Sequence, residues 1–313
     1  MRVGLMLPPE LDLAEVVGRA ADAEARGFDF LACGEHVFFH RAVPNAFVTL
    51  AAAAGATSRI RLLSALTILP VYPAALAAKM VATLDGVSRG RFELGVGVGG
   101  EFPAEFEACG IPLEERGRRT DEALAVLGEL FTGLPVDFAG AYGSLRGAVL
   151  QPPPVQRPRP PLWIGGRREA ALRRTARFGD GWLPYLVSPE QLATGLERIG
   201  ALAEDHGRSA DEIRGGVFCW GAVDPDGGRA RRIALDTLSA LYQQDLTRHA
   251  DRYLVAGTPQ AAVARLREYA DAGAESIVFA PACPAADLDR VIDLFATEVL
   301  PRLQTAEDRS RCA

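Results

Sequence analysis

Residues 162–184 read LWIGGRREAALRRTARFGDGWLP, and the order of patterns in this stretch decides the fold. Leu162 to Ile164 form a short apolar run that ends in two glycines. A segment with the apolar spacing of a helix follows, and a second short run begins at Gly181. Two short strands with a helix between them are typical of a parallel sheet, because parallel strands need a crossover connection that is usually helical.

The same alternation of short apolar runs and helical segments continues along the chain. The strands that it predicts are Val3–Leu7, Phe30–Cys33, Ile60–Leu66, Phe92–Val98, Leu162–Ile164, Gly181–Pro184, Gly216–Trp220 and Ser276–Phe279. Eight parallel strands alternating with helices predict an α/β fold, a (β/α)8 TIM barrel, with long insertions after strands 4 and 7. We expect a single barrel domain over residues 1–313, with the proline run at 151–161 as a connector inside it.

The composition excludes several classes of protein. Hydrophobic residues make up 49% of the chain and charged residues 24%, as in ordinary globular proteins. The formal net charge of −6 argues against nucleic-acid binding. Among 34 basic residues only Lys79 is a lysine, which leaves one candidate for Schiff-base chemistry.

The cysteines and the apolar runs indicate the compartment. Five cysteines with no CxxC pair argue against a disulfide framework and against a metal site. No run approaches the roughly 18 apolar residues of a membrane span, and the amino terminus does not read as a secretory signal. We therefore expect a soluble cytoplasmic protein that does not bind membranes.

The loop after the second predicted strand is the first candidate for chemistry. It begins Cys33-Gly34-Glu35-His36, and two of the four histidines, His36 and His40, lie in it. Active sites of barrels are built from the loops after the carboxyl ends of the strands, so His36 is a candidate acid or base near neutral pH. The alternatives are a hydrogen bond to a cofactor carbonyl or to the backbone, and Glu35 is equally an ordinary ion-pair partner.

The glycines at 95–100 match the GxGxxG pattern after a strand. A dinucleotide site also needs an immediate helix and an acidic residue at the end of the next strand, whereas Asp121 lies inside a helical pattern. Small residues here, Gly97 and Gly99 among them, would instead let a flat ring approach the barrel mouth closely. Glu101 and Glu105 follow at the rim and would face the substrate, although solvation is commoner for such residues.

The glycine pair Gly165-Gly166 opens a helical segment. Backbone N–H groups at a helix amino terminus bind phosphate, and barrels often place a phosphate site in their late loops. Arg167 and Arg168 would add positive charge; the alternative is a simple tight turn. Trp182, at the next strand, is either a pocket wall or part of the core.

Several stretches together resemble the bacterial luciferase-like family of flavin- and deazaflavin-dependent oxidoreductases, most clearly over residues 1–185. These stretches are GEHV at 34–37, ATLDGVSRGRFELGVGVGG at 82–100, the EF, G and ERGRRTDE elements across 105–122, QPPPVQRPRPPLWIGG at 151–166, FGDGW at 178–182 and VAGTP at 255–259. In the last of them Thr258 would cap a helix.

The resemblance implies a cofactor ring at the carboxyl end of the barrel, against strands three and four, with its phosphate on the Gly165-Gly166 turn. Ser64, Ala65 and Leu66 align with the place where members that use the deazaflavin coenzyme F420 carry a backbone bulge, often with a cis peptide. A histidine matching His36 often lies beside the ring, and an acidic residue like Glu35 precedes it in many F420 members. The resemblance also implies a homodimer.

Our leading hypothesis is hydride transfer between F420 and an organic substrate, with His36 as acid or base and Glu35 orienting or tuning it. The runner-up is an FMN-dependent monooxygenase that uses O2 and reduced flavin from a separate reductase. A phosphate-binding lyase or isomerase is a third possibility, although Lys79 lies mid-helix; a non-catalytic flavin-binding relative is a fourth. Aromatic and polar residues at the strand ends would line a pocket for a bulky organic substrate. They are Phe38, Phe39, His40, Glu101, Trp182, Tyr185 and Trp220.

Overall fold

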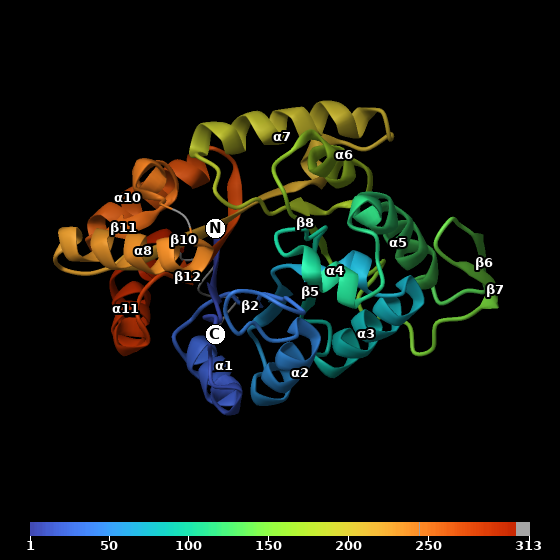
Figure 1. The fold of residues 1–313 in the computed structure, drawn as a ribbon, viewed down its shortest axis with the longest axis horizontal. Coiled ribbons are helices and arrows are strands. Elements are labelled where there is room, and N and C mark those ends of the chain that lie inside the picture. Colours follow the sequence, from blue (N-terminus) through green and yellow to red (C-terminus); the bar gives the residue numbers. More distant parts are fainter. Residues whose placement is uncertain (244, 305–313) are drawn as a thin grey trace.

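The computed structural model describes residues 1–243 and 245–304. Eight parallel strands form a closed ring, because β10 pairs with β9 on one side and with β12 on the other, and β12 pairs with β1 (Figure 1). The ring strands are β1 (Arg2–Met6), β2 (Phe30–Cys33), β3 (Arg61–Ser64), β5 (Phe92–Gly97), β8 (Leu162–Ile164), β9 (Gly181–Trp182), β10 (Arg214–Val223) and β12 (Ala274–Pro281). The predicted (β/α)8 TIM barrel is therefore confirmed.

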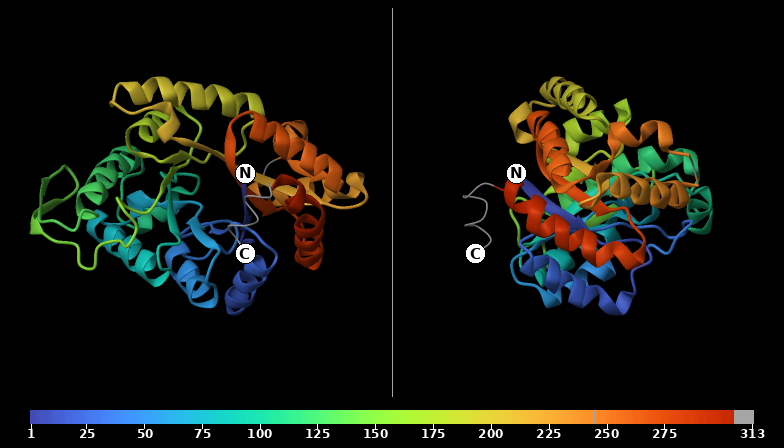
Figure 2. Two further views of the ribbon diagram at one scale, coloured as in Figure 1. Left: turned by 180° about the vertical axis from the view of Figure 1, so that it is seen from behind. Right: turned by 90° about the vertical axis from the view of Figure 1, so that its left-hand side faces the viewer.

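Helices surround this ring. They are α1 (Val16–Ala25), α2 (Ala46–Ala56), α3 (Ala74–Val87), α5 (Arg116–Leu130), α6 (Glu169–Phe178), α7 (Pro189–Glu204), α8 (Gly227–Tyr242), α10 (Pro259–Asp271), α11 (Leu288–Leu294) and α12 (Leu300–Leu303). Figure 1 looks onto the end of the barrel where the strands finish. Figure 2 shows both chain termini on the opposite side.

The two long insertions lie where the sequence predicts them. After β5 the chain forms the short helix α4 (Pro103–Ala108), then α5, and then a hairpin of β6 (Val136–Ala139) and β7 (Ser144–Ala148) at the edge of the molecule (Figure 1). After β10 it forms α8, α9 (Ala250–Tyr253), β11 (Val255–Gly257) and α10. The hydroxyl of Thr258 accepts a hydrogen bond from the N–H of Ala261 at 3.3 Å, so the predicted cap on α10 is confirmed.

The third predicted strand is interrupted. We expected one strand over Ile60–Leu66, but β3 ends at Ser64 and a separate strand, β4 (Thr67–Ile68), then pairs with β5. The Ala65–Leu66 peptide between them is cis. The hydroxyl of Ser64 donates to the carbonyl of Gly95 and accepts from its N–H, both at 3.0 Å, and these bonds hold the end of β3 against β5. The bulge implied by the family resemblance is therefore present.

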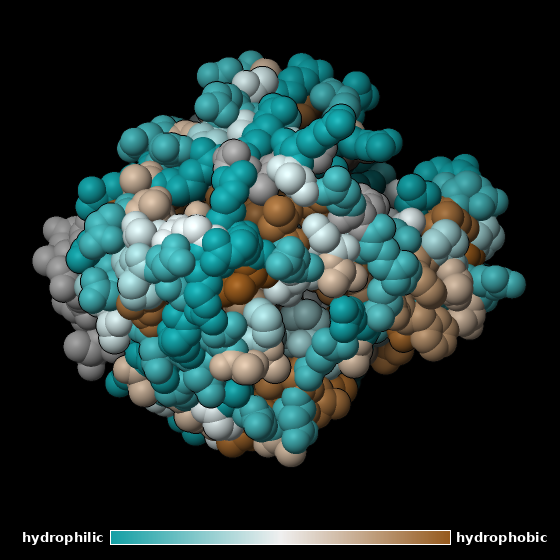
Figure 3. Space-filling view, turned by 60° about the vertical axis from the view of Figure 1, so that its left-hand side comes forward, coloured by the Kyte–Doolittle hydropathy of each residue, from teal (hydrophilic) through white to brown (hydrophobic). Residues whose placement is uncertain are grey.

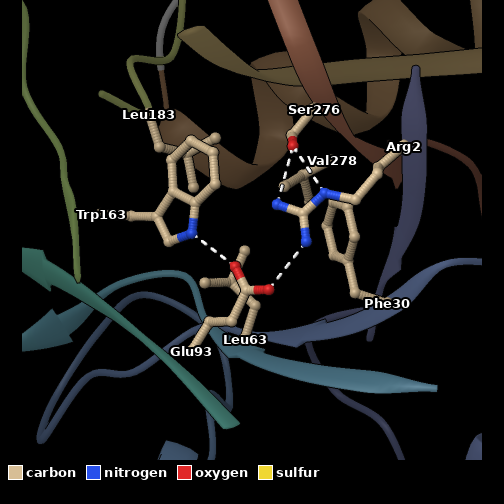
Figure 4. A pocket seen from close by; sticks show the side chains of 8 residues that line it. All are labelled: Arg2, Phe30, Leu63, Glu93, Trp163, Leu183, Ser276 and Val278. Carbon is tan, nitrogen blue, oxygen red and sulfur yellow. Dashed lines mark hydrogen bonds and ion pairs between the residues drawn. The ribbon is translucent and has the colours of Figure 1, made fainter. Parts of the chain in front are cut away.

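Side chains close the amino end of the barrel interior. Glu93 accepts hydrogen bonds from Arg2 at 2.8 Å, from the indole of Trp163 at 2.6 Å, and from Arg61; Arg2 also contacts Ser276 (Figure 4). Burial alone would raise the pKa of Glu93, but the guanidinium groups outweigh it and lower the pKa to about 2. Access to the barrel interior is therefore left to the opposite, carboxyl end.

Candidate active site

The loop after β2 and the helix α4 bring a histidine and a carboxylate together. His36 Nδ1 lies 3.2 Å from Glu105 Oε2, and the same oxygen accepts the N–H of Val37 at 3.1 Å. Glu105 is 0% exposed, whereas the ring of His36 is partly accessible. Because Nδ1 faces the carboxylate, Nε2 is the ring nitrogen available for proton transfer to a ligand.

The second oxygen of Glu105 is unusual. Within the described residues, Oε1 is buried and has no hydrogen-bond partner. A buried carboxylate oxygen left unpaired costs free energy, so such an atom is typical of a site that receives a polar group from a bound molecule. We had expected Glu105 to be a rim residue, with solvation as its commoner fate. The structure instead places it in the interior, as the partner of His36.

Glu35, which we predicted to orient or tune His36, holds the histidine loop in place. Its carboxylate accepts the amide of Asn45 at 3.2 Å, the N–H of Ala46 at 3.2 Å and the N–H of Ile68 at 3.3 Å. Burial raises the pKa of Glu35, and these donors partly oppose the increase. Glu35 therefore ties the histidine loop to the start of α2 and to β4, while Glu105 forms the hydrogen bond to the ring of His36.

Aromatic rings extend from His36 along the loop. The ring of Phe39 stacks on His36 with centroids 4.2 Å apart, and His40 follows at 5.2 Å from Phe39 and 5.3 Å from Phe102. Phe38, which we predicted to line the pocket, is 50% exposed. Phe39 therefore packs against the histidine, and Phe38 faces solvent.

Glycines at the ends of β5 and β8 make room for Leu66. A Cβ atom at Gly165 would lie 1.9 Å from Leu66 Cδ1, and one at Gly95 would lie 2.8 Å from Leu66 Cδ2, whereas one at Gly97 would make an ordinary contact with Leu66 at 3.4 Å. Gly165 and Gly95 therefore allow the bulge residue Leu66 to lie against β5 and the end of β8. Gly99 serves another purpose: with φ +61 it packs under Phe106, and a Cβ there would lie 3.0 Å from that ring.

The Gly165-Gly166 turn leads into α6, and no side chain caps this helix. Gly166 has φ +95, a conformation that favours glycine. Arg167 turns away from the helix, since it donates to the carbonyl of Leu186 at 2.8 Å and its Cζ lies 5.6 Å from the ring centroid of Tyr185. The backbone N–H groups at the start of α6 form the candidate phosphate site, and the guanidinium of Arg167 is directed towards Leu186 and Tyr185.

Of the two alternatives for Trp182, a pocket wall or part of the core, the structure shows a core position. Its indole is buried and donates to the carbonyl of Gly166 at 2.8 Å. On its other side the ring packs on α7, where a Cβ at Gly195 would lie 2.2 Å from it. Trp182 therefore supports the glycine turn from behind the sheet.

The wall of the mouth formed by β10 and α8 is aromatic. Phe218 and Trp220 have ring centroids 5.2 Å apart, and the Trp220 indole donates to the hydroxyl of Tyr242 at 3.2 Å. The hydroxyl of Tyr185 donates to Glu101, so Glu101 is engaged with the protein rather than free for a substrate. Burial and the nearby Glu101 raise the pKa of Tyr242 to about 12, so this phenol stays protonated at neutral pH.

Sequence reasoning missed Tyr242 and the partnership of Glu105. The motif at 105–122 contained Glu105, but its separation of 69 positions from His36 hides their proximity. Tyr242 ends α8, a helix that none of the quoted motifs covers. In residues 1–243 and 245–304, no group of His, Cys, Asp and Glu side chains could hold a metal ion.

The structure thus combines a parallel barrel with a histidine loop, a bulged third strand and a glycine turn before a helix, the features that the family resemblance implies. The family model described as luciferase-like monooxygenase matches residues 1–276. The chain therefore belongs to the luciferase-like monooxygenase family, as its motifs predicted.

Curated relatives match part of the chain. Uncharacterized proteins of Mycobacterium tuberculosis (strain ATCC 25618 / H37Rv) and Mycobacterium bovis are 34% identical to it over 164 residues. The match covers 52% of this chain and 56% of each relative, so the chain spans about half the length of the curated relatives it matches.

Solved structures share the whole fold. An F420-dependent secondary alcohol dehydrogenase in complex with an F420-acetone adduct has a TM-score of 0.85 at 22% identity, over 97% of this chain and 99% of that one. Monooxygenase RslO1 from Streptomyces bottropensis has a TM-score of 0.85 at 24% identity, over 97% of this chain and 100% of that one. The oxygenating constituent of 3,6-diketocamphane monooxygenase from Pseudomonas putida, in complex with FMN, has a TM-score of 0.78 at 17% identity, over 97% of this chain and 99% of that one. At these identities the likeness establishes the fold alone.

None of the helices in the described part of the chain has the length and apolar character needed to cross a lipid bilayer.

Proposed function

We propose that this luciferase-like oxidoreductase transfers hydride between coenzyme F420 and a bulky organic substrate, with His36 as the acid or base. The observation that carries the proposal is the His36–Glu105 pair, in which a buried carboxylate holds Nδ1 at 3.2 Å and keeps a second, unpartnered oxygen. A pair of this kind is suited to move a proton to or from a substrate atom as hydride transfer changes that atom's basicity.

The residues present fit a flat ring that carries a phosphate. Leu66, seated on Gly97 and Gly165, offers an apolar surface beside the mouth, and the uncapped start of α6 offers N–H groups for an anion. When bound, the deazaflavin supplies or accepts the hydride. Gly165 and Gly166 would hold its phosphate, and Ser64, Ala65 and Leu66 would support its ring.

The side chains of this protein supply the remaining steps. His36 Nε2 donates a proton to, or accepts one from, the reacting group, and Glu105 stabilises the imidazolium through Nδ1. Glu35 positions the loop that carries His36 through its bonds to Ala46 and Ile68. The aromatic wall of Phe39, Trp220 and Tyr242 excludes water and supports a bulky, mostly apolar substrate.

A second candidate is an FMN-dependent monooxygenase. The family model carries the description luciferase-like monooxygenase, and one structural neighbour is described in complex with FMN. In that case His36 would lie near the reacting flavin, and a separate reductase would supply reduced FMN.

The test of the proposal is binding and turnover with each cofactor. We expect the protein to bind F420 and to convert a member of a panel of alcohols, ketones and enones. His36→Ala should retain F420 binding while turnover falls about 100-fold or more, the usual contribution of a general acid or base. Retained turnover in His36→Ala would remove His36 from the mechanism, and binding of FMN alone would favour the second candidate.

We also propose that the chain, as one barrel domain over residues 1–313, forms a homodimer through the outer face of α2 and α3. Helix α2, AFVTLAAAAGA, has no charged residue, and Val48 on it is 70% exposed; Leu76 on the neighbouring α3 is 51% exposed. Figure 3 shows hydrophobic side chains in the lower part of the molecule, where Figure 1 places these helices. Sedimentation should give a dimer that Val48→Glu dissociates; a monomeric wild type would contradict the proposal.

A further inference from the structure

Residues 98–101 lie between β5 and α4 at the barrel mouth, where Gly99 packs against Phe106 and Gly100 against Arg116. Among the described residues, no backbone hydrogen bond links this segment to another part of the protein. Its hydrogen bond to the rest of the chain is the one that Glu101 accepts from the Tyr185 hydroxyl. Gly99 and Gly100 have φ +61 and +107, so the backbone here adopts conformations that other residues rarely do.

Tyr185, by contrast, is firmly held. Its backbone forms a bridge to Phe218 of β10, and the N–H of Phe218 donates to the carbonyl of Pro184 at 2.9 Å. The guanidinium of Arg167 lies 5.6 Å from its ring centroid and bonds to Leu186 at 2.8 Å. The tyrosine is therefore a fixed point on the barrel, and Glu101 at the end of the segment 98–101 is hydrogen-bonded to it.

We propose that Glu101 and Tyr185 form a latch that holds residues 98–101 across one side of the barrel mouth and that opens when molecules enter or leave. The latch joins the loop after β5 to the loop after β9, and Arg167 extends it to the glycine turn after β8. Its role in exchange rests on the proposed function, since that proposal places the cofactor and substrate in this mouth. The role of the latch in holding residues 98–101 is independent of the proposed function.

The latch has a direct structural consequence. Burial and the carboxylate of Glu101 raise the pKa of Tyr185, so the phenol remains a donor across the neutral range. When the bond breaks, the segment loses its hydrogen bond to the barrel while β5 and α4 on either side stay in place. Opening is therefore local, and it exposes the peptide bond after Glu101 to a protease that cleaves after glutamate.

The first test is cleavage by Glu-C protease, followed by mass spectrometry. Tyr185→Phe removes only the donor hydroxyl, and Tyr142→Phe, on the hairpin loop, is the matched control. We expect cleavage after Glu101 to become about fivefold faster in Tyr185→Phe, the effect of losing one hydrogen bond of ordinary strength. Cleavage after the exposed Glu212 should be equal in all three proteins. Equal cleavage after Glu101 in wild type and Tyr185→Phe would overturn the latch.

The second test concerns exchange. Release of bound F420 or FMN, followed by its fluorescence after dilution, should be faster in Tyr185→Phe and unchanged in Tyr142→Phe. Unchanged release together with faster cleavage would overturn the role in exchange. If the protein binds neither cofactor, the proposed function fails, and the protease result still decides whether the latch holds the segment.

Discussion

In the proposed mechanism, the chemistry depends on His36 and Glu105. One oxygen of Glu105 contacts Nδ1 of the His36 ring and also accepts the N–H of Val37. The carboxylate therefore fixes the ring orientation and the loop backbone together. Its complete burial means that its charge acts on His36 with little screening by solvent.

Glu105→Gln should lower kcat about 10- to 100-fold, because the amide keeps the shape of the side chain but cannot stabilise a charged imidazole. The thermal midpoint should change little, since an amide oxygen can still accept the N–H of Val37. Glu107→Gln, on the exposed face of α4, is the matched control and should leave kcat unchanged. Equal kcat in all three proteins would remove Glu105 from the mechanism.

At the scale of elements, the mouth is shaped by where β3 stops. Leu66 reaches over the ends of β5 and β8 because β3 ends at Ser64 and β4 begins at Thr67. Glycine at position 165 is required by this packing. The same bulge therefore sets the apolar surface for the ring and the position of the turn before α6.

Gly165→Ala tests this packing. Its Cβ would overlap Leu66, so we expect a loss of about 1–3 kcal/mol in the free energy of unfolding and weaker cofactor binding. Leu66→Ala in the same chain should recover much of the lost stability by removing the obstructing methyl groups. Chemical denaturation measures both variants, and a double variant no more stable than Gly165→Ala would refute the packing argument.

The elements differ in how well the sequence predicts them. Phe30–Cys33 and Leu162–Ile164 were predicted with their observed bounds, because short buried runs between turn residues are clear signals. The interruption at Ala65 has no local signal in the sequence of residues 60–66, and only the family resemblance implied it. The side of β9 to which Trp182 points was ambiguous, since β9 has only two residues and shows no alternation. The His36–Glu105 contact depends on how the loop after β2 and helix α4 fold over the barrel mouth, which no local pattern encodes.

At the scale of the whole molecule, several residues in the family motifs hold the barrel together. Asp85 accepts the N–H groups of Val155 at 2.7 Å and Gln156 at 3.0 Å, and so attaches the proline connector to α3. Glu93 joins β1, β3, β5 and β8 at the closed end through its bonds to Arg2, Arg61 and Trp163. The motifs thus identified the family largely through residues that support the site from a distance.

Glu93→Gln should cost about 3–5 kcal/mol at pH 7, because it removes the charge of a buried carboxylate that pairs with the partly buried Arg2 and Arg61. The folded-state pKa of Glu93 is about 2, below the ordinary value of 4.5, so the unfolded chain binds the extra proton. The stabilisation is therefore complete above pH 4.5 and is lost as the pH falls towards 2. The free energies of unfolding of wild type and Glu93→Gln, measured by denaturation, should converge over that pH range. A constant difference between them down to pH 2 would contradict the stabilising role of the Glu93 carboxylate.

The proposed hydride transfer depends on which cofactor the mouth of the barrel accepts. The most direct measurement is the absorbance spectrum and mass of the cofactor that remains bound when the protein is purified from cells that make both F420 and FMN. We predict the spectrum and mass of F420. Tightly bound FMN with oxygen-dependent turnover, and no binding of F420, would contradict the proposed F420-dependent function.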